Sequence, residues 1–441
     1  MLLTAVDRTS RDRNRGPPQE PAEPADKRPT PSRRSLRGLD WFVFFLADVQ
    51  TGFGPFVAVY LTTQKWTQVE IGLVLSVSGL VALAGQMPGG ALVDAVRSVR
   101  FLAGLAVAAI GVAALAYAAL PTFLVVMMAA VLHASASCVL GPAIAAMSLG
   151  LVGQAAVGER FGRNARFASI GSGIAAAVMG ACGYFLSSRS VFLVTVALVI
   201  PALVALAQIR AGEIDPERTH GAMPRSDQTP RRSTAGMTSL LRNRPLLTFA
   251  GCVLLFQLAN AAMLPIMAGV VTTRSSNWAT ILIAACIIVP QIVVAAISPW
   301  VGRKAQQWGR RPLLLIGYAA LPIRGLLFAT VTDPYVLVVI QVLDGITAAV
   351  FAVMVPLTIA DATLGSGRFS LAQGMVGTAT GIGASISTVL AGYISDHHGS
   401  SMAFLVLAAV AAVGLISVYA LMPETRRDDG RSSPKPLPAG G

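Results

Sequence analysis

Twelve long apolar segments constrain this chain more than any other feature. About 20 apolar residues in an α-helix cross the roughly 30 Å hydrocarbon core of a bilayer, where each segment must satisfy its own backbone hydrogen bonds. We therefore predict an all-α membrane protein with twelve transmembrane helices. The segments span residues 40–62, 69–91, 101–119, 122–143, 165–186, 190–209, 246–271, 278–300, 313–331, 336–359, 371–393 and 402–422.

The composition agrees with a membrane protein, because 54% of the residues are hydrophobic and only 12% are charged. Soluble domains carry about 25% charged residues. The net charge is +13, but the basic residues lie in two tails and in short loops, so we expect no nucleic-acid partner. The opening MLLTAV is too short for the apolar region of a signal peptide, so the first helix is expected to direct membrane insertion.

One long polar interruption, rich in proline and charge, divides the helices into six plus six. We expect disordered cytoplasmic tails at both ends, because these segments lack apolar periodicity. The predicted parts are a tail at 1–37, a six-helix bundle at 38–209, a cytoplasmic linker at 210–244, a second six-helix bundle at 245–424 and a tail at 425–441.

The basic residues between the helices predict the orientation of the chain. One alternating set of loops, including the linker, holds 17 basic residues, and the other set holds 3. Basic residues concentrate in cytoplasmic loops. We therefore predict a multi-pass protein of the cell membrane, with both termini in the cytoplasm.

A glycine-punctuated basic segment, GRKAQQWGRRP, begins at Gly302 between two apolar runs. A related segment, GALVDAVRSVR, begins at Gly90, again between two apolar runs. A repeat at so wide a separation in so apolar a chain predicts a duplicated membrane bundle. The residues that we assign to this motif are Gly90, Asp94, Arg97 and Arg100 in the first copy, and Gly302, Gln306, Gly309, Arg310 and Arg311 in the second.

These segments resemble the GxxxDxxGRR signature that members of the major facilitator superfamily carry between helices 2 and 3, and again between helices 8 and 9. The second copy departs at Gln306, where the family has aspartate, and the first has Arg97 and Ser98 where glycine and arginine are expected. The resemblance covers residues 38–424. It implies two six-helix bundles related by a pseudo-twofold axis along the membrane normal, with a central cavity and alternating access.

The motif residues have physical roles in a loop that gates the two halves. Glycine permits the positive φ of tight turns and close backbone approach. The arginines are suited to anchor on phosphate headgroups and helix C-terminal carbonyls, and Asp94 to pair across the bundle. A second repeat, at a similar separation, places Gly162–Arg163 and Gly367–Arg368 at the starts of helices 5 and 11.

Ionisable residues inside the membrane are costly and are functional candidates. Asp48 lies in helix 1, which lines the cavity in the family, and is followed by Gln50. Arg324 and Asp344 lie at matching depths in helices 9 and 10, so we predict an ion pair between them. The pair is either a permanent structural contact or one that breaks and reforms during transport, as its position resembles the proton-coupling region of sugar symporters in the superfamily.

Other polar residues in the helices have two interpretations each. His133 in helix 4 is either a packed, hydrogen-bonded histidine or a proton relay. The neutral amides either bind an uncharged solute or join helices. These amides are Gln257, Asn260, Gln291 and Gln341.

The sequence predicts no enzyme and no cofactor. None of the four lysines lies in a GxxxxGK segment, so transport is expected to be secondary. The four cysteines lie in apolar segments without metal-ligand spacing, so no metal is expected. In helix 5, Gly171 and Gly180 have the spacing of the superfamily's antiporter motif, but Tyr184 and Phe185 replace its final Gly-Pro.

The predicted function is secondary transport of a small organic solute, coupled to protons, by a monomer among membrane lipids. We place an exporter ahead of an importer of a sugar-like or other polar metabolite. A receptor or lipid-interacting protein on the same fold is the remaining alternative, and wholly apolar residues along the central cavity would favour it.

Overall fold

The computed structural model describes residues 31–424, apart from 52, 54, 222–239, 241, 275–278 and 332. The tails at 1–30 and 425–441 and most of the predicted linker therefore lie outside the described residues. The described part of the chain is helical and contains no strand. The N-terminal half consists of α1 (Arg33–Thr51), α2 (Pro55–Thr63), α3 (Gln68–Ala95), α4 (Val99–Ala119), α5 (Phe123–Phe185) and α6 (Ser190–Gln208).

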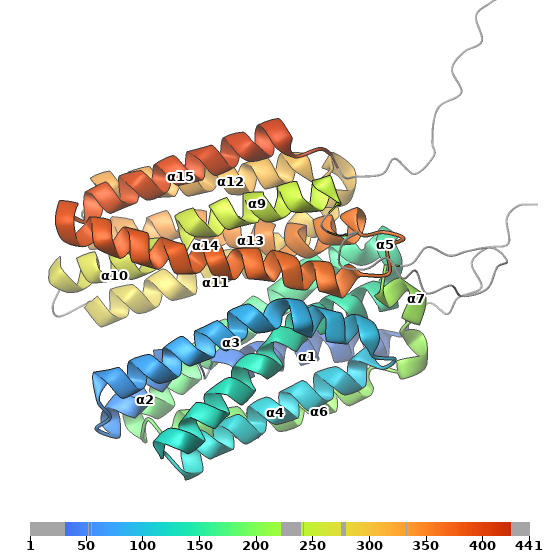
Figure 1. The fold of residues 1–441 in the computed structure, drawn as a ribbon, viewed down its shortest axis with the longest axis horizontal. Coiled ribbons are helices and arrows are strands. Elements are labelled where there is room, and N and C mark those ends of the chain that lie inside the picture. Colours follow the sequence, from blue (N-terminus) through green and yellow to red (C-terminus); the bar gives the residue numbers. More distant parts are fainter. Residues whose placement is uncertain are drawn as a thin grey trace, which may run out of the picture. The chain divides into compact units, whose positions relative to one another are not determined.

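The linker contributes two short helices, and the C-terminal half follows (Figure 1). The linker helices are the 3₁₀ helix η1 (Ala211–Glu213) and α7 (Pro216–Thr219). The C-terminal half consists of α9 (Arg244–Asn260), α10 (Met263–Arg274), α11 (Ala279–Trp308), α12 (Arg311–Thr330), α13 (Pro334–Ala362), α14 (Phe369–His398) and α15 (Ser400–Leu421).

Ten helical segments among the described residues are long and apolar enough to cross a membrane. One of them, α5, is 63 residues long and reverses direction at Gly153, where φ is 70°. The reversal brings the Nδ2 atom of Asn164 to 2.8 Å from the Oγ atom of Ser148, whereas a straight helix would hold these two residues about 24 Å apart. With α5 counted twice, and with α1–α2 and α9–α10 each counted as one interrupted pass, the predicted twelve passes are present in the described part of the chain.

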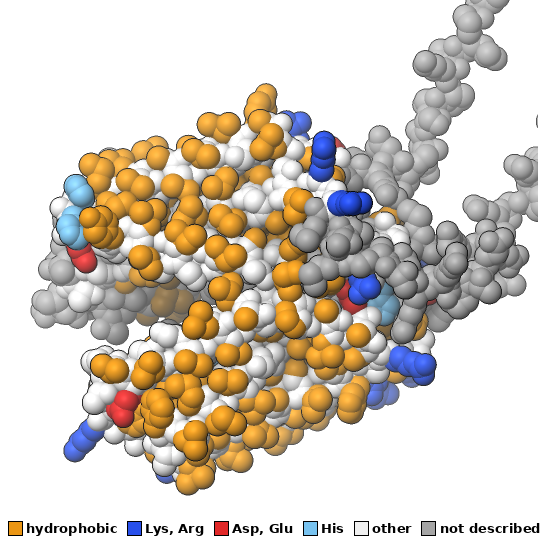
Figure 2. Space-filling view, in the orientation of Figure 1, with side chains coloured by type: hydrophobic (Ala, Val, Ile, Leu, Met, Phe, Trp, Pro, Cys, Tyr) orange, Lys and Arg blue, Asp and Glu red, His pale blue; other side chains and the backbone are white. Residues whose placement is uncertain are grey.

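The loops alternate between two ends of the helix bundle. We call the end that carries η1 and α7 the linker end, and the opposite one the distal end. The linker packs on both halves, because Asp215 N–H donates to the carbonyl of Gly150 and Gly365 N–H donates to that of Gly221. In Figure 2, orange apolar side chains cover the flank of the helices, while Lys and Arg lie towards the ends, as expected of a surface that faces lipid.

Local sequence explains where several helices begin. Thr67 and Glu70 form a reciprocal capping box at the start of α3. The carboxylate of Asp333 accepts from the N–H groups of Tyr335 and Val336 in the first turn of α13. Gly399, with φ of 85°, provides the sharp turn that separates α14 from α15.

The motif segment GRKAQQWGRRP is mostly helical, which corrects our prediction of a loop. Helix α11 continues through Trp308, and Gly309, with φ of 90°, makes the turn before α12. The first copy is similar, because α3 continues to Ala95. Gly90 and Gly302 therefore lie inside helices, where their role is close packing and not a turn.

The stretch between predicted helices 4 and 5 is also helical apart from the reversal at Gly153. Gly162 and Arg163 lie inside the second pass of α5, whereas Arg368 directly precedes α14. The repeat that we drew between these two Gly-Arg pairs was therefore wrong. A hydropathy pattern indicates where a helix stops contacting lipid and not where the helix itself ends. Both passes of α5 continue beyond the lipid, so the pattern placed the helix ends too early.

The predicted tail 1–37 is also too long, because α1 begins at Arg33. The carboxylate of Glu213 accepts from the backbone N–H and the hydroxyl of Ser32 at 2.9 and 2.8 Å. Burial acts to raise the pKa of Glu213, but hydrogen bonds from Ser32 and Ser35 and the charge of Arg210 together outweigh it, and the pKa is lowered. Buried Ser35 accepts from Arg210 N–H, so the linker holds the first turn of α1 in place.

Candidate functional site

The predicted ion pair between α12 and α13 is present. The Nη1 atom of Arg324 contacts Oδ1 of Asp344 and also donates to Oδ1 of Asn260 in α9 at 3.0 Å. The side chain of Arg324 is 1% exposed, while that of Asp344 is 21% exposed. Three helices of the C-terminal half therefore meet at one buried cation, whose carboxylate partner keeps some access to its surroundings.

Three further amides lie in helices of the same half. Gln341 is one turn before Asp344 and fully buried, and neither of its amide atoms has a partner in the described part of the chain. Gln257, in α9, and Gln291, in α11, are half-buried. A fully buried amide without partners is costly, whereas Gln257 and Gln291 are the two that keep some exposed surface.

In the N-terminal half, Asp48 lies near the end of α1 and is 3% exposed. Its Oδ1 atom has no hydrogen-bond partner among the described residues. It faces α5, because a Cβ atom added at Gly171 would lie 3.1 Å from that oxygen. Gln50 is half-buried near the end of the same helix. A buried carboxylate with an unpartnered oxygen is a strong candidate to bind a proton or a cationic group.

His133 is packed in the N-terminal half. Its ring stacks on Phe53, with the centroids 3.9 Å apart, and its Nε2 atom lies 3.3 Å from the hydroxyl of Ser137. This geometry favours the interpretation of His133 as a packed, hydrogen-bonded histidine.

The first pass of each half is interrupted, and the two breaks lie within one helical turn of equivalent positions. α1 ends at Thr51 before α2 begins at Pro55, and α9 ends at Asn260 before α10 begins at Met263. Asp48 and Asn260 are as far apart in the sequence as Gly90 and Gly302. Interrupted helices at matching positions mark the substrate site in many transporters.

The equivalent positions differ in their partners. Asn260 accepts from Arg324, but the repeat that aligns Asp48 with Asn260 aligns Val112 with Arg324. Asp48 therefore occupies the position of Asn260 without the cation that satisfies Asn260. The two halves therefore share the same helix arrangement and differ in the polar side chains at equivalent positions.

At the linker end, the motif glycines let the two halves touch backbone to backbone. A Cβ atom at Gly90 would overlap the carbonyl of Ser370 in α14, and one at Gly302 would overlap the carbonyl of Gly158 in α5. Gly374 packs in the same way on Gln86, and Gly162 on Ser298. Each of these four residues of the α3–α14 contact has its counterpart in the α11–α5 contact at the separation that relates Gly90 to Gly302. The two contacts are therefore related by the pseudo-twofold repeat.

Asp94 pairs across the halves, as predicted. Its carboxylate accepts from the N–H groups of Ser370 and Leu371 at 3.1 and 2.8 Å, in the first turn of α14. The equivalent Gln306 faces Gly158, which is already inside a helix that restarts after Gly153. The N–H groups of a helix interior are occupied, which explains why a carboxylate is needed at only one of the two positions.

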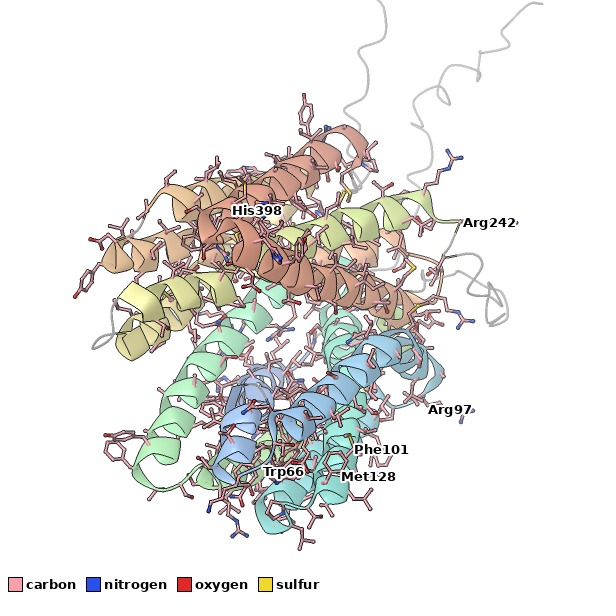
Figure 3. All side chains as sticks on the ribbon, turned by 60° about the vertical axis from the view of Figure 1, so that its left-hand side comes forward. Trp66, Arg97, Phe101, Met128, Arg242 and His398 are labelled. Carbon is pink, nitrogen blue, oxygen red and sulfur yellow. The ribbon has the colours of Figure 1, made fainter. Side chains whose placement is uncertain are left out.

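The motif arginines have different environments. Arg100 and Arg311 donate to the carbonyls of Ile209 and Tyr419, near the C-termini of α6 and α15, as predicted. Arg97 is exposed and points away from the bundle at the linker end (Figure 3). Arg310 is buried and pairs with Asp361 of α13 at 2.7 Å.

The sequence did not identify two buried carboxylates at the linker end. Asp361 joins the halves, because it also accepts from Gln154 of α5 at 2.6 Å. Asp40 of α1 pairs with Arg160 and Arg163 of α5. Both acids lie at the edges of apolar segments, where a solvated loop residue and a buried one have the same sequence pattern.

No group of three His, Cys, Asp or Glu side chains in the described ranges could hold a metal ion. The four cysteines are free thiols, three of them buried.

Comparisons with known proteins agree with this geometry. A model of the Major Facilitator Superfamily matches residues 41–321 and again 255–440. An uncharacterized MFS-type transporter of Mycobacterium tuberculosis, found in strains CDC 1551 / Oshkosh and H37Rv, is 37% identical over 411 residues, covering 92% of this chain and 97% of that protein.

Solved structures share the fold at low sequence identity. The proton:xylose symporter XylE is 13% identical with a TM-score of 0.68, covering 89% of this chain and 96% of that one. The human organic anion transporter MFSD10 is 13% identical with a TM-score of 0.66, covering 88% and 99%. The E. coli fucose:proton symporter FucP is 15% identical with a TM-score of 0.62, covering 87% and 98%.

Proposed function

Because the chain belongs to the major facilitator superfamily, we propose that this multi-pass membrane transporter moves a small organic solute by alternating access, coupled to protons. Family membership makes it a transporter and not an enzyme. The observation that carries the proton coupling is the buried carboxylate of Asp48, whose Oδ1 atom has no hydrogen-bond partner among the described residues, beside the interruption of the first pass.

The contacts at the linker end support alternating access. The glycine contacts and the Asp94 cap join the halves there, while the space-filling surface is hollowed between the halves at the distal end (Figure 2). The basic loops predict that the linker end is cytoplasmic. This conformation is then the outward-open state, and separating the linker-end contacts opens the cavity to the cytoplasm.

We assign the proton to Asp48 and the solute to the C-terminal half. Among the described residues no cation pairs with Asp48, so a proton is the simplest counter-charge for its buried carboxylate. Gln341, Gln257 and Gln291 offer neutral donors and acceptors in the same half as the Arg324–Asp344 pair. Such groups suit an organic solute with hydroxyl, carbonyl or amide groups.

Export in exchange for protons is the direction we propose first, with both termini in the cytoplasm. Proton-coupled import of a polar metabolite is the second candidate, favoured by the arginine–carboxylate pair on the ninth and tenth passes. The sugar:proton symporters XylE and FucP have the same fold. Polar side chains in both halves argue against a receptor with a wholly apolar centre.

The test is flux in proteoliposomes with an imposed pH gradient and a panel of radiolabelled solutes. For a solute that is transported, Asp48→Asn should abolish the drive from the pH gradient and leave solute counterflow intact. Asp396→Asn, an exposed acid at the distal end, is the matched control and should keep coupling. Unchanged gradient-driven flux in Asp48→Asn would remove Asp48 from the mechanism, and flux that ignores the gradient in the unaltered protein would overturn proton coupling.

A further inference from the structure

A cavity of about 450 Å³ lies at the linker end, between the first turns of α1 and the second pass of α5. It is outside the central site and is not used in the proposed transport cycle. Its apolar lining comes from Leu36, Val152 and Ala156. Its charged lining consists of Arg33, Arg37, Arg160, Arg163 and Glu159.

The cavity carries an excess of positive charge. Four arginines line it against one glutamate. Arg160 and Arg163 share the buried carboxylate of Asp40, at 2.5 and 2.6 Å. No carboxylate in the described part of the chain pairs with Arg33 or Arg37, and both side chains are exposed. Two guanidinium groups are therefore available to an anion.

Aromatic residues place this cavity at the boundary between lipid and water. Trp41 follows Arg37 by one turn of α1 and is 47% exposed. It packs against Phe45 and Phe167, and the guanidinium of Arg163 lies 5.7 Å from the centre of the Phe167 ring. Exposed tryptophan beside arginine is typical of the headgroup level of a bilayer. An anion in the cavity would thus have an apolar, lipid-facing surface directly beside it.

We propose that this cavity binds the phosphate of an acidic phospholipid in the leaflet at the linker end. Arg33 and Arg37 contact the phosphate oxygens as charged donors, a role for which the guanidinium fork is suited. The glycerol and acyl chains lie along Leu36 and Trp41. Glu159 on the rim disfavours a dianion, so a phosphodiester with one charge fits better than a phosphate monoester or free phosphate.

The test measures lipid binding by the full chain in detergent, and does not depend on transport. Phosphatidylglycerol, phosphatidylcholine or inorganic phosphate is titrated, and the thermal unfolding midpoint and the bound lipid in native mass spectrometry are recorded. We expect phosphatidylglycerol to stabilise the protein more than phosphatidylcholine does. In the Arg33→Gln/Arg37→Gln variant its apparent affinity should fall by about tenfold or more, since a charged hydrogen bond contributes about 1.5–3 kcal/mol.

Two controls make the result specific. Arg242→Gln/Arg303→Gln removes the same charge from exposed arginines away from the cavity, and Figure 3 shows Arg242 pointing outward; this variant should bind like the unaltered protein. The Arg33→Lys/Arg37→Lys variant keeps both charges and should retain most of the lipid binding. Retained binding would show that the first turns of α1 tolerate substitution at these positions. An equal loss in the Arg242/Arg303 control, or no loss in the Gln variant, overturns the site. Equal stabilisation by inorganic phosphate overturns its assignment to lipid.

Discussion

The ion pair between α12 and α13 allows a sharp test because its members are unequally buried. The side chain of Arg324 is 1% exposed and that of Asp344 is 21% exposed. Removing Asp344 leaves a guanidinium that neither reaches water nor loses its proton. Removing Arg324 leaves a carboxylate that retains some access to its surroundings. Asp344→Ala should therefore destabilise the protein more than Arg324→Met.

The expected sizes follow from the cost of an uncompensated buried charge. Removing one partner of a buried pair costs about 3–5 kcal/mol, and we place Asp344→Ala in that range. Arg324→Met should cost about 1–3 kcal/mol, the cost of burying an unsatisfied polar group. The double variant should be more stable than Asp344→Ala alone, because it leaves no isolated charge, and should show a coupling energy of about 2 kcal/mol or more.

The assay is unfolding in mixed micelles with increasing sodium dodecyl sulfate, followed by circular dichroism for the four proteins of the cycle. Additive costs of the two single variants, or a larger cost for Arg324→Met, would refute this reasoning. Transport by the same four proteins distinguishes a structural ion pair from one that takes part in the transport cycle. If the pair is structural, the double variant transports; if it breaks and reforms during transport, the double variant folds but does not transport.

Three further predictions concern the linker end and the tail. Gly302→Val should disfavour the conformation in which the halves touch at the linker end by about 1–3 kcal/mol, or roughly 5–150-fold, because overpacking against a backbone carbonyl is costly. Spin labels at positions 97 and 303 should then report a longer distance between the halves. An unchanged distance would contradict the contact. Asp94→Ala should produce a smaller shift of about 0.5–2 kcal/mol, the size of a lost helix cap, in the same measurement. Deleting residues 1–30 should leave flux unchanged, and an inactive truncation would show that the tail has a role.

The passes and the intramembrane ion pair were predictable for the same physical reason. Lipid penalises every unsatisfied polar group, so segment length and isolated charges stand out in the sequence. Arg324 and Asp344 are opposite charges that lipid forces to pair, and their depths in the membrane could be counted from the loop that joins their helices at the distal end. The participation of Asn260 was not predictable, since a neutral amide in a helix has too many possible partners.

The linker end was predicted less well, because there the helices extend beyond the lipid and the hydropathy of the sequence no longer indicates where they end. The segment 302–308 carries four polar residues and is still helical. Asp361 and Asp40 lie at the edges of apolar runs, although both are buried in their ion pairs. Their partners are distant in sequence, with Arg310 being 51 residues before Asp361. Pairing of this kind depends on how the helices pack, and no local pattern encodes it.

The internal repeat is most informative where its two copies differ. Equivalent glycines make equivalent contacts between the halves, and two equivalent polar positions beside this framework differ. Asp94 corresponds to Gln306, and the difference follows from a helix start that only one of them faces. Asp48 corresponds to Asn260, and the difference follows from a cation that only Asn260 contacts. Packing explains the first difference completely. It does not explain the second, a buried acid whose Oδ1 atom has no partner in the described part of the chain, which is why we place the coupling proton on Asp48.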